Sequence, residues 1–240
     1  MVYTALLLLK SLKRGEVKKI CGIYGSFNPS KFEILDRVNQ KRGNFASGLL
    51  FHNGEIYDIQ RKEGIFDWDD IKLFDGFMYL GHNQAPTSSE RKWQEHNSHP
   101  FVCEHWAVAH NGVLTNFNEL RASYLPNHEN SVDSSIIPAL LLQYEQDLKI
   151  KCKTPEQEIP IIQYVLNLLQ GTFGLWIVNL RSLNVYIARQ GSTLFADYNS
   201  FSSTKGIDYV ELQEGVIYSF AKNGAQKVGE FKAKSPFLEL

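Results

Sequence analysis

The stretch Ala109-His110-Asn111-Gly112-Val113-Leu114-Thr115-Asn116 joins a predicted strand, 101–110, to a predicted helix, 116–124. It has the form of a strand that ends in a polar loop, because Asn-Gly favours a turn. Amide side chains and backbone N–H groups at a strand end can also hold a developing oxyanion. The pattern by itself indicates a turn, so the other segments decide whether it does more.

A second predicted strand, 76–82, ends in the same way. It leads into the polar loop Gly81-His82-Asn83-Gln84-Ala85-Pro86-Thr87-Ser88. Far upstream, Cys21-Gly22-Ile23 opens the predicted strand 21–27, and its glycines suit a backbone that approaches another group closely. A single cysteine in an apolar strand is most often a core side chain.

Periodicity extends these segments into a regular fold. A capping-box pattern at 30–33 predicts a helix over 31–41, and Asn53-Gly54 predicts a hairpin between strands 47–51 and 55–60. Helical spacing of apolar residues predicts helices at 133–147 and 154–171. Later strands are expected at 172–179, 183–188, 193–195, 209–212 and 216–220. Early strands, central helices and late strands predict an α+β fold in which helices cover the outer faces of sheets.

Composition excludes several classes of protein. The 240 residues are 43% hydrophobic and carry 25 basic and 26 acidic residues, which excludes disorder and gives no basic face for nucleic acid. Three cysteines without paired spacing do not form a disulfide framework. The apolar run at 5–9 is far shorter than the roughly 18 residues of a membrane helix, and its basic residues follow it, the reverse of a signal peptide. We therefore expect a soluble cytoplasmic protein that binds neither nucleic acid nor a membrane.

Taken together, the motifs resemble one family. They comprise Cys21-Gly22-Ile23, Arg42-Gly43 with Ser47-Gly48, Gly81-His82 with Ala85-Pro86-Thr87, His110 to Asn116, and Val132-Asp133-Ser134. Their order and spacing resemble those of the class II glutamine amidotransferases over roughly residues 21 to 220. The resemblance implies the four-layer αββα sandwich of N-terminal nucleophile hydrolases. It also implies a glutaminase that releases ammonia from the glutamine side chain, with no cofactor and no metal.

The resemblance assigns roles to particular residues. Cys21 would be the nucleophile, and its own free α-amino group would be the base, since an α-amine titrates near pH 8. Asn111 would donate its side-chain amide, and Gly112 its backbone N–H, to the oxyanion. Asp133 would hold the α-ammonium group of glutamine, a role compatible with a helix N-cap.

The remaining substrate-binding assignments are less direct. His82 belongs to the Gly81-His82 motif and is assigned to the substrate pocket with Arg42, for which a buried structural ion pair is the alternative. Gln84 stands where family members usually carry an Arg that pairs with the substrate α-carboxylate. Three outcomes stay open: weaker glutamine binding, replacement by Arg91, or a donor other than free glutamine.

The twenty residues before Cys21 would block its α-amine in a peptide bond. We expect either a propeptide cleaved after Ile20 or a translation start at codon 20, and a purine-rich coding sequence for Arg14-Gly15-Glu16 favours the second. The expected organisation is thus a leader over 1–20 and a single glutaminase-type domain over 21–240. Ammonia would pass to a separate synthase subunit.

Four other interpretations remain. A zinc site could be formed by His96, His99, Cys103 and His105, although alternation along a strand argues against it. A papain-like protease lacks its signature around Cys21. Another N-terminal nucleophile amide hydrolase would share the fold, and a degenerate, non-catalytic domain that binds a synthase would explain Gln84.

Overall fold

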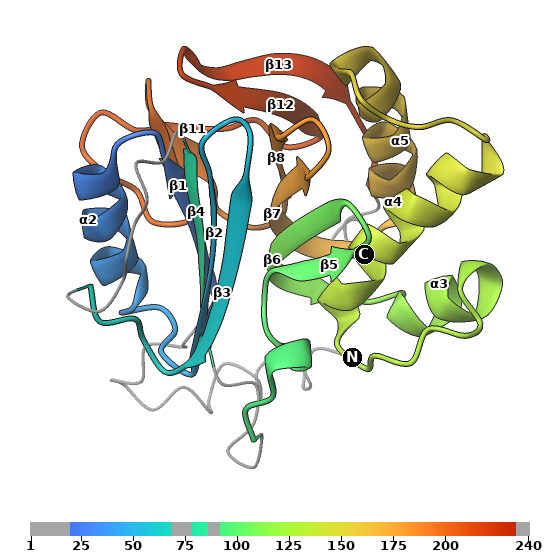
Figure 1. The fold of residues 1–240 in the computed structure, drawn as a ribbon, viewed down its shortest axis with the longest axis horizontal. Coiled ribbons are helices and arrows are strands. Elements are labelled where there is room, and N and C mark those ends of the chain that lie inside the picture. The colour runs from blue at the N-terminus through green and yellow to red at the C-terminus, as the bar shows by residue number, and fades with distance from the viewer. Residues whose placement is uncertain (1–19, 69–77, 86–91, 234–240) are drawn as a thin grey trace, which may run out of the picture.

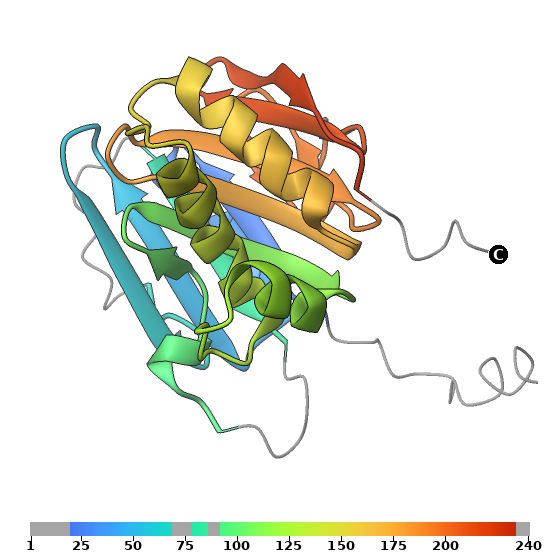
Figure 2. The same cartoon turned by 90° about the vertical axis from the view of Figure 1, so that its right-hand side faces the viewer.

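The computed structural model describes residues 20–68, 78–85 and 92–233, which form four layers in the order helix, sheet, sheet, helices (Figure 1). Each sheet is built from antiparallel strand pairs. Helix α2 covers the outer face of one sheet, and α4 and α5 cover the outer face of the other (Figures 1 and 2). This confirms the predicted α+β class and the αββα sandwich of the N-terminal nucleophile hydrolase type.

The first sheet carries the cysteine-bearing strand near its centre. Its seven strands, in order across the sheet, are β11 (Val210–Glu211), β9 (Phe195–Ala196), β10 (Ser200–Ser202), β1 (Gly22–Ser26), β4 (Met78–Gln84), β2 (Ala46–His52) and β3 (Tyr57–Glu63). Strand β1 therefore pairs with β4 on one side and with β10, from the far end of the sequence, on the other.

The second sheet has six strands. They are β13 (Gly224–Glu230), β12 (Val216–Ala221), β8 (Asn184–Gln190), β7 (Gly171–Asn179), β6 (Trp106–Leu114) and β5 (Phe101–Cys103). The helical segments are α2 (Pro29–Asn39), η1 (Glu95–Asn97), α3 (Phe117–Tyr124), η2 (Asp133–Ser135), α4 (Ile136–Asp147) and α5 (Pro155–Leu168).

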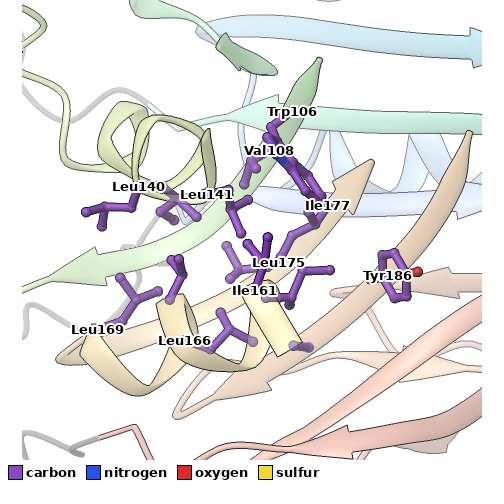
Figure 3. Close-up of a cluster of buried hydrophobic side chains, with 14 of the residues drawn as sticks. Trp106, Val108, Leu140, Leu141, Ile161, Leu166, Leu169, Leu175, Ile177 and Tyr186 are labelled. Carbon is purple, nitrogen blue, oxygen red and sulfur yellow. The ribbon is translucent and has the colours of Figure 1, made fainter. Parts of the chain in front are cut away.

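Two apolar cores separate the layers. Trp106, Val108, Leu175 and Ile177 of the second sheet pack against α4 and α5 (Figure 3). The alternate residues of the same strands, such as Ala107 and Trp176, face the first sheet and pack with residues that include Ile23 and Leu80. Side chains alternate between the two faces of a strand. The face on which each polar residue of these strands lies therefore follows from its apolar neighbours.

Several predicted elements need correction. The single strand expected at 101–110 is a hairpin, β5–β6, that turns at Glu104 with a φ of 49°. Strand β6 then continues through Asn111 and Gly112 to Leu114, so the Asn-Gly pair lies inside a strand and not in a turn. The N-cap of α2 is Asn28, whose side chain accepts from Lys31 N at 2.9 Å, and not Ser30.

Other predicted elements are confirmed with shifted ends. The 47–60 hairpin is β2–β3, and its turn uses Gly54 at a φ of 101° with Asn53 Oδ1 accepting from two backbone N–H groups. The predicted strand 76–82 is seen from Met78 onward, since 69–77 lie outside the described residues. Strands β10 and β13 were not predicted. No helix within the described ranges is long and apolar enough to cross a membrane.

Candidate active site

Four candidate side chains, those of Cys21, His82, Gln84 and Asn111, face the gap between the two sheets. Ile23 and Leu80 point into the core between the sheets, so Cys21, two residues before Ile23, and the alternate positions His82 and Gln84 on β4 share that side. Asn111 shares the parity of Ala109 on β6 and faces them from the second sheet. The nucleophile candidate and the amide donor candidate thus lie on opposing sheets, directed toward the same space.

Cys21 lies beside the end of β4. The register pairs Gly22 with Asn83 and Ile23 with His82, which brings Cys21 next to the residues that follow Asn83. The backbone N–H of Ala85 donates to Cys21 Sγ at 3.4 Å. Residues 86–91, which include Pro86, Thr87, Ser88 and Arg91 of the sequence motif, lie outside the described residues.

Arg42 holds the backbone around Cys21. Its Nε donates to the carbonyl oxygen of Cys21 at 3.0 Å, and its Nη1 donates to that of Ser203 at 3.3 Å. Burial lowers the pKa of Arg42, and the charge of Cys21 opposes that shift. No ion pair of Arg42 is found among the described residues, so its observed contacts are with carbonyl groups. A cation close to a thiol is typical of reactive cysteines.

Gly112 is a position where only glycine fits. A methyl group there would lie 1.9 Å from the carbonyl oxygen of Thr172 on the neighbouring strand β7. The glycine allows β6 and β7 to pair without a break here, where Asn111 lies opposite Gly174 and Gly112 opposite Phe173. The close approach explains why Gly112, the second donor candidate, is a glycine.

Ser203 links Asn111 to the nucleophile strand. Asn111 Nδ2 donates to Ser203 Oγ at 3.1 Å, and the backbone N–H of Ile23 donates to the same oxygen at 3.1 Å. Sequence reasoning missed this residue, because Ser203 follows the unpredicted strand β10 in a serine-rich segment without periodicity. Finding Ser203 would have required a prediction that β10 pairs with β1.

Asp133 connects η2 with β6. Its Oδ2 accepts from the backbone N–H of Leu114 at 2.8 Å, and its Oδ1 accepts from Ser134 Oγ at 3.1 Å. Val132 is the N-cap of η2 and Ser135 that of α4, so Asp133 is not the N-cap residue. Asp133 and Gly112 line one open hollow of about 540 Å³. The Asp133 residue thus lines the same hollow as Gly112, whereas Cys21 and Asn111 are not among its lining residues.

His82 is buried between the two sheets. Its Nε2 donates to the carbonyl oxygen of His110 at 3.1 Å, and its ring stacks on that of His99 with centroids 3.8 Å apart. Burial lowers the pKa of His82 to about 3, so the ring is neutral. His110 Nδ1 lies 2.8 Å from Ser134 Oγ, which extends the contacts of His82 to the segment that carries Asp133.

Gln84 is the last residue of β4 and is buried. Its carbonyl oxygen accepts from Phe45 N at 2.9 Å, and its backbone packs against Gly43, where a methyl group would lie 2.4 Å from the carbonyl carbon of Gln84. The Arg42-Gly43 motif and the end of β4 are therefore in direct contact, although 41 positions separate Gly43 from Gln84.

Two of the four residues of the zinc interpretation, His99 and His105, contact other side chains. His105 Nε2 lies 2.6 Å from Glu145 Oε2, and His99 stacks on His82. In the part of the chain that the structure describes, no three His, Cys, Asp or Glu side chains are grouped to hold a metal ion.

Comparison with known proteins identifies relatives but no matching family model. The chain is 30% identical over 207 residues to glutamine–fructose-6-phosphate aminotransferase (isomerizing) of Bartonella henselae, which covers 80% of this chain and 32% of the relative. The enzyme of the same name from Listeria monocytogenes is 23% identical over 225 residues, covering 85% of this chain and 36% of the relative. The chain thus spans about a third of the length of these curated relatives.

Solved structures support the same fold. Glutamine phosphoribosylpyrophosphate amidotransferase from B. subtilis, complexed with ADP and GMP, superposes with a TM-score of 0.67 at 19% identity, over 89% of this chain and 49% of that one. A structure described as the allosteric regulatory enzyme of purine biosynthesis gives a TM-score of 0.69 at 20% identity, over the same shares. These two structures show the fold, and the curated relatives together with the ordered sequence motifs show that the chain contains a class II glutamine amidotransferase domain.

Proposed function

We propose that this domain hydrolyses the side-chain amide of glutamine through a thioester on Cys21 and delivers the ammonia to a synthase. The observation that carries the proposal is the pair of hydrogen bonds to Ser203 Oγ, one from Ile23 N and one from Asn111 Nδ2. They couple the strand that begins beside Cys21 to the amide that would stabilise the oxyanion. An oxyanion donor of this kind contributes on the order of 3 kcal/mol to the transition state.

The reaction begins when the thiol of Cys21 transfers its proton to the free α-amine of the same residue. The thiolate attacks the side-chain carbonyl carbon of glutamine, and the resulting oxyanion accepts from Asn111 Nδ2 and the backbone N–H of Gly112. Collapse of the tetrahedral intermediate breaks the C–N bond, and the leaving amide nitrogen takes the proton from the α-ammonium group and departs as ammonia. The product is a γ-glutamyl thioester.

Water then completes the reaction. The α-amine takes a proton from the water molecule as its oxygen attacks the thioester carbonyl, and the same two donors hold the second oxyanion. Breaking the C–S bond releases glutamate, and the leaving thiolate takes the proton back from the α-ammonium group, which returns Cys21 to its thiol and free amine. Asp133 binds the α-ammonium group of the substrate, while the buried contacts of His82 and Arg42 support the pocket from behind.

The mechanism requires Cys21 to be the first residue of the active form, so we also propose that residues 1–20 are absent from it. Ile20 is 46% exposed, which places the peptide bond in front of Cys21 near the surface. Either cleavage after Ile20 or a start at codon 20 would give the same active chain, residues 21–240.

The acceptor of ammonia is proposed to be bound by a synthase, because the curated relatives are named as aminotransferases, and we propose that this synthase is a separate subunit. The alternative, a non-catalytic domain that only binds such a synthase, is favoured by Gln84 in place of the usual Arg.

The deciding experiment measures glutamate and ammonia release from glutamine by a chain that begins at Cys21, compared with its Cys21→Ala variant. We expect equal amounts of the two products from the first and none from the second, with both variants unfolding at similar temperatures. Equal rates from the two proteins would eliminate the thioester mechanism. An inert Cys21 chain that still binds a synthase would establish the non-catalytic alternative.

A further inference from the structure

Ser203 is almost completely buried and lies where three parts of the chain meet. It follows β10, and its backbone N–H donates to the carbonyl oxygen of Ile23 at 2.8 Å, which continues the pairing of β10 with β1. Its hydroxyl accepts from Ile23 N and from Asn111 Nδ2, each at 3.1 Å. One oxygen atom therefore joins the first sheet to the second at the level of the proposed nucleophile.

The backbone of Ser203 is fixed independently of its side chain. Its carbonyl oxygen accepts from Thr193 Oγ1 at 2.9 Å and from Arg42 Nη1 at 3.3 Å. Arg42 also donates to the carbonyl oxygen of Cys21, so Ser203 and Cys21 are held by one guanidinium group. A residue held in this way presents its hydroxyl from a constant position.

We infer that Ser203 is a positioning residue that orients the Asn111 amide toward the oxyanion formed at Cys21. This inference rests on the proposed glutaminase function. An amide nitrogen carries two hydrogens, and one of those on Asn111 is used by Ser203, so the second is left for the oxyanion. Without the hydroxyl, the Asn111 side chain would keep its two rotatable bonds and lose the contact that selects one orientation.

The hydroxyl is needed for its lone pairs. Both hydrogen bonds to Ser203 Oγ come from donors, so the oxygen acts twice as an acceptor, a capacity that a hydroxyl has and a methyl group lacks. Threonine keeps this oxygen, whereas alanine removes it and leaves the N–H of Ile23 without the acceptor it has here. Transition-state stabilisation depends on donors that are oriented before the reaction.

Ser202 provides a matched control. It is the preceding residue and is fully buried, but its hydroxyl accepts from Asn39 Nδ2 at 2.9 Å and from Thr204 N at 3.0 Å, on the side of the sheet that carries α2. Ser202→Ala thus removes a buried hydroxyl of the same size from the same segment without touching Asn111.

The test measures kcat and KM for glutamine in chains that begin at Cys21 and carry Ser203→Ala, Ser203→Thr, Ser203→Cys or Ser202→Ala. We expect Ser203→Ala to lower kcat by about tenfold to a hundredfold, with KM changed less than about threefold, because the donor acts mainly in the transition state. Ser203→Thr should retain most of kcat, and Ser202→Ala should match the unsubstituted chain. Thermal unfolding of each variant separates loss of positioning from loss of fold.

A double-mutant cycle with Asn111→Ala identifies the route of the effect. If Ser203 acts through Asn111, Ser203→Ala should cost less than about threefold in kcat once Asn111 is already Ala. Full additivity, or kcat of Ser203→Ala equal to that of Ser202→Ala, would overturn the inference and leave the proposed function intact. If Ser203→Ala does not fold, Ser203→Cys, which keeps the volume with a weak acceptor, carries the same comparison. An inert unsubstituted chain would instead overturn the proposed function and the inference with it.

Discussion

The backbone N–H of Ala85 is directed at the Sγ of Cys21 across 3.4 Å, although the two residues are 64 positions apart in the sequence. The contact places the end of β4 against the proposed nucleophile and leaves the amino side of Cys21 to the solvent-exposed Ile20. The proposed mechanism requires a free amine, and not a peptide bond, on that side of Cys21.

Residues 1–20 should abolish glutaminase activity while they remain attached. A chain that starts at Met1 and carries Ile20→Pro, which is designed to hinder cleavage before Cys21, should release no glutamate above the Cys21→Ala background. The chain that starts at Cys21 should be active. Intact mass spectrometry of both proteins identifies their first residue, and activity in a chain proven to retain residue 20 would contradict the α-amine as base.

Asn111→Ala should lower kcat by on the order of a hundredfold while KM changes little, as expected for a donor used mainly in the transition state. Asn111→Asp is the sharper variant, because it keeps the size of the side chain and replaces the donor with a negative charge that repels the oxyanion. It should be at least as inactive as Asn111→Ala. A large rise in KM with unchanged kcat would place Asn111 in ground-state binding.

Asp133→Asn should raise KM for glutamine by about tenfold to a hundredfold with little change in kcat, since it removes the charge that pairs with the α-ammonium group. The asparagine oxygen can still accept from Leu114 N, so the tie between η2 and β6 is preserved. Asp147→Asn, at the end of α4, is the control for a carboxylate remote from the hollow. An unchanged KM would show that Asp133 does not bind the substrate and serves only as the acceptor for Leu114 N.

Gln84→Arg should tighten glutamine binding by about tenfold to a hundredfold, because a guanidinium supplies a charge-assisted contact to the α-carboxylate. Gln84→Glu, of similar size and opposite charge, should weaken it. The effect of each substitution is measured from KM in the active chain and from equilibrium binding of glutamine in the Cys21→Ala background. If neither changes KM but Arg91→Ala raises it, the carboxylate contact belongs to Arg91. If none of the three has an effect, free glutamine is not the donor, and γ-glutamyl compounds with a blocked carboxylate become the substrates to assay.

Glu145→Gln should reduce the dependence of stability on pH. Burial of Glu145 raises its pKa, but hydrogen bonds from Cys152 N, Trp106 and His105 outweigh burial and bring the pKa below its usual value. The carboxylate also pairs with Arg181 at 3.0 Å. A group with a depressed pKa stabilises the fold above its unfolded pKa, and that contribution is lost as pH falls through the folded value.

Urea unfolding at pH 7 and at acidic pH measures this effect. At pH 7 the Glu145→Gln variant should be less stable by about 1–3 kcal/mol, and the difference should shrink as the pH falls below about 4. Glu129→Gln, on an exposed loop, should leave both values unchanged. A constant difference at all pH values would show that the charge of Glu145 is not what stabilises the fold.

The part of the site that could be predicted lies in segments whose local sequence is distinctive. Cys21, Asn111 and Asp133 belong to ordered motifs. That Cys21 and Asn111 face the same gap could not be predicted, because β6 begins with four apolar residues in a row and β1 is buried throughout. Asn-Gly at 111–112 misled the turn prediction because the glycine is required by the close approach of Thr172 O and not by a turn. The turn at Glu104 was not predicted, because it contains no Gly, Pro or Asn, the residues that usually indicate a turn.

Ser203 could not be found in this way. Strand β10 is three residues long, has no alternating pattern and owes its extended form to pairing with β1. Propensity carries little information for such a segment, because tertiary contacts determine it. A role that depends on two partners in distant parts of the chain is visible only when all three are in place.

The pairing of β1 with the end of β10 also sets the order of events during synthesis. The strand beside Cys21 is among the first parts to leave the ribosome, yet the hydroxyl that receives its Ile23 N–H is made 180 residues later. The hydrogen bond from Ile23 N to Ser203 Oγ, and with it the link to Asn111, can therefore form only after nearly the whole domain has been translated.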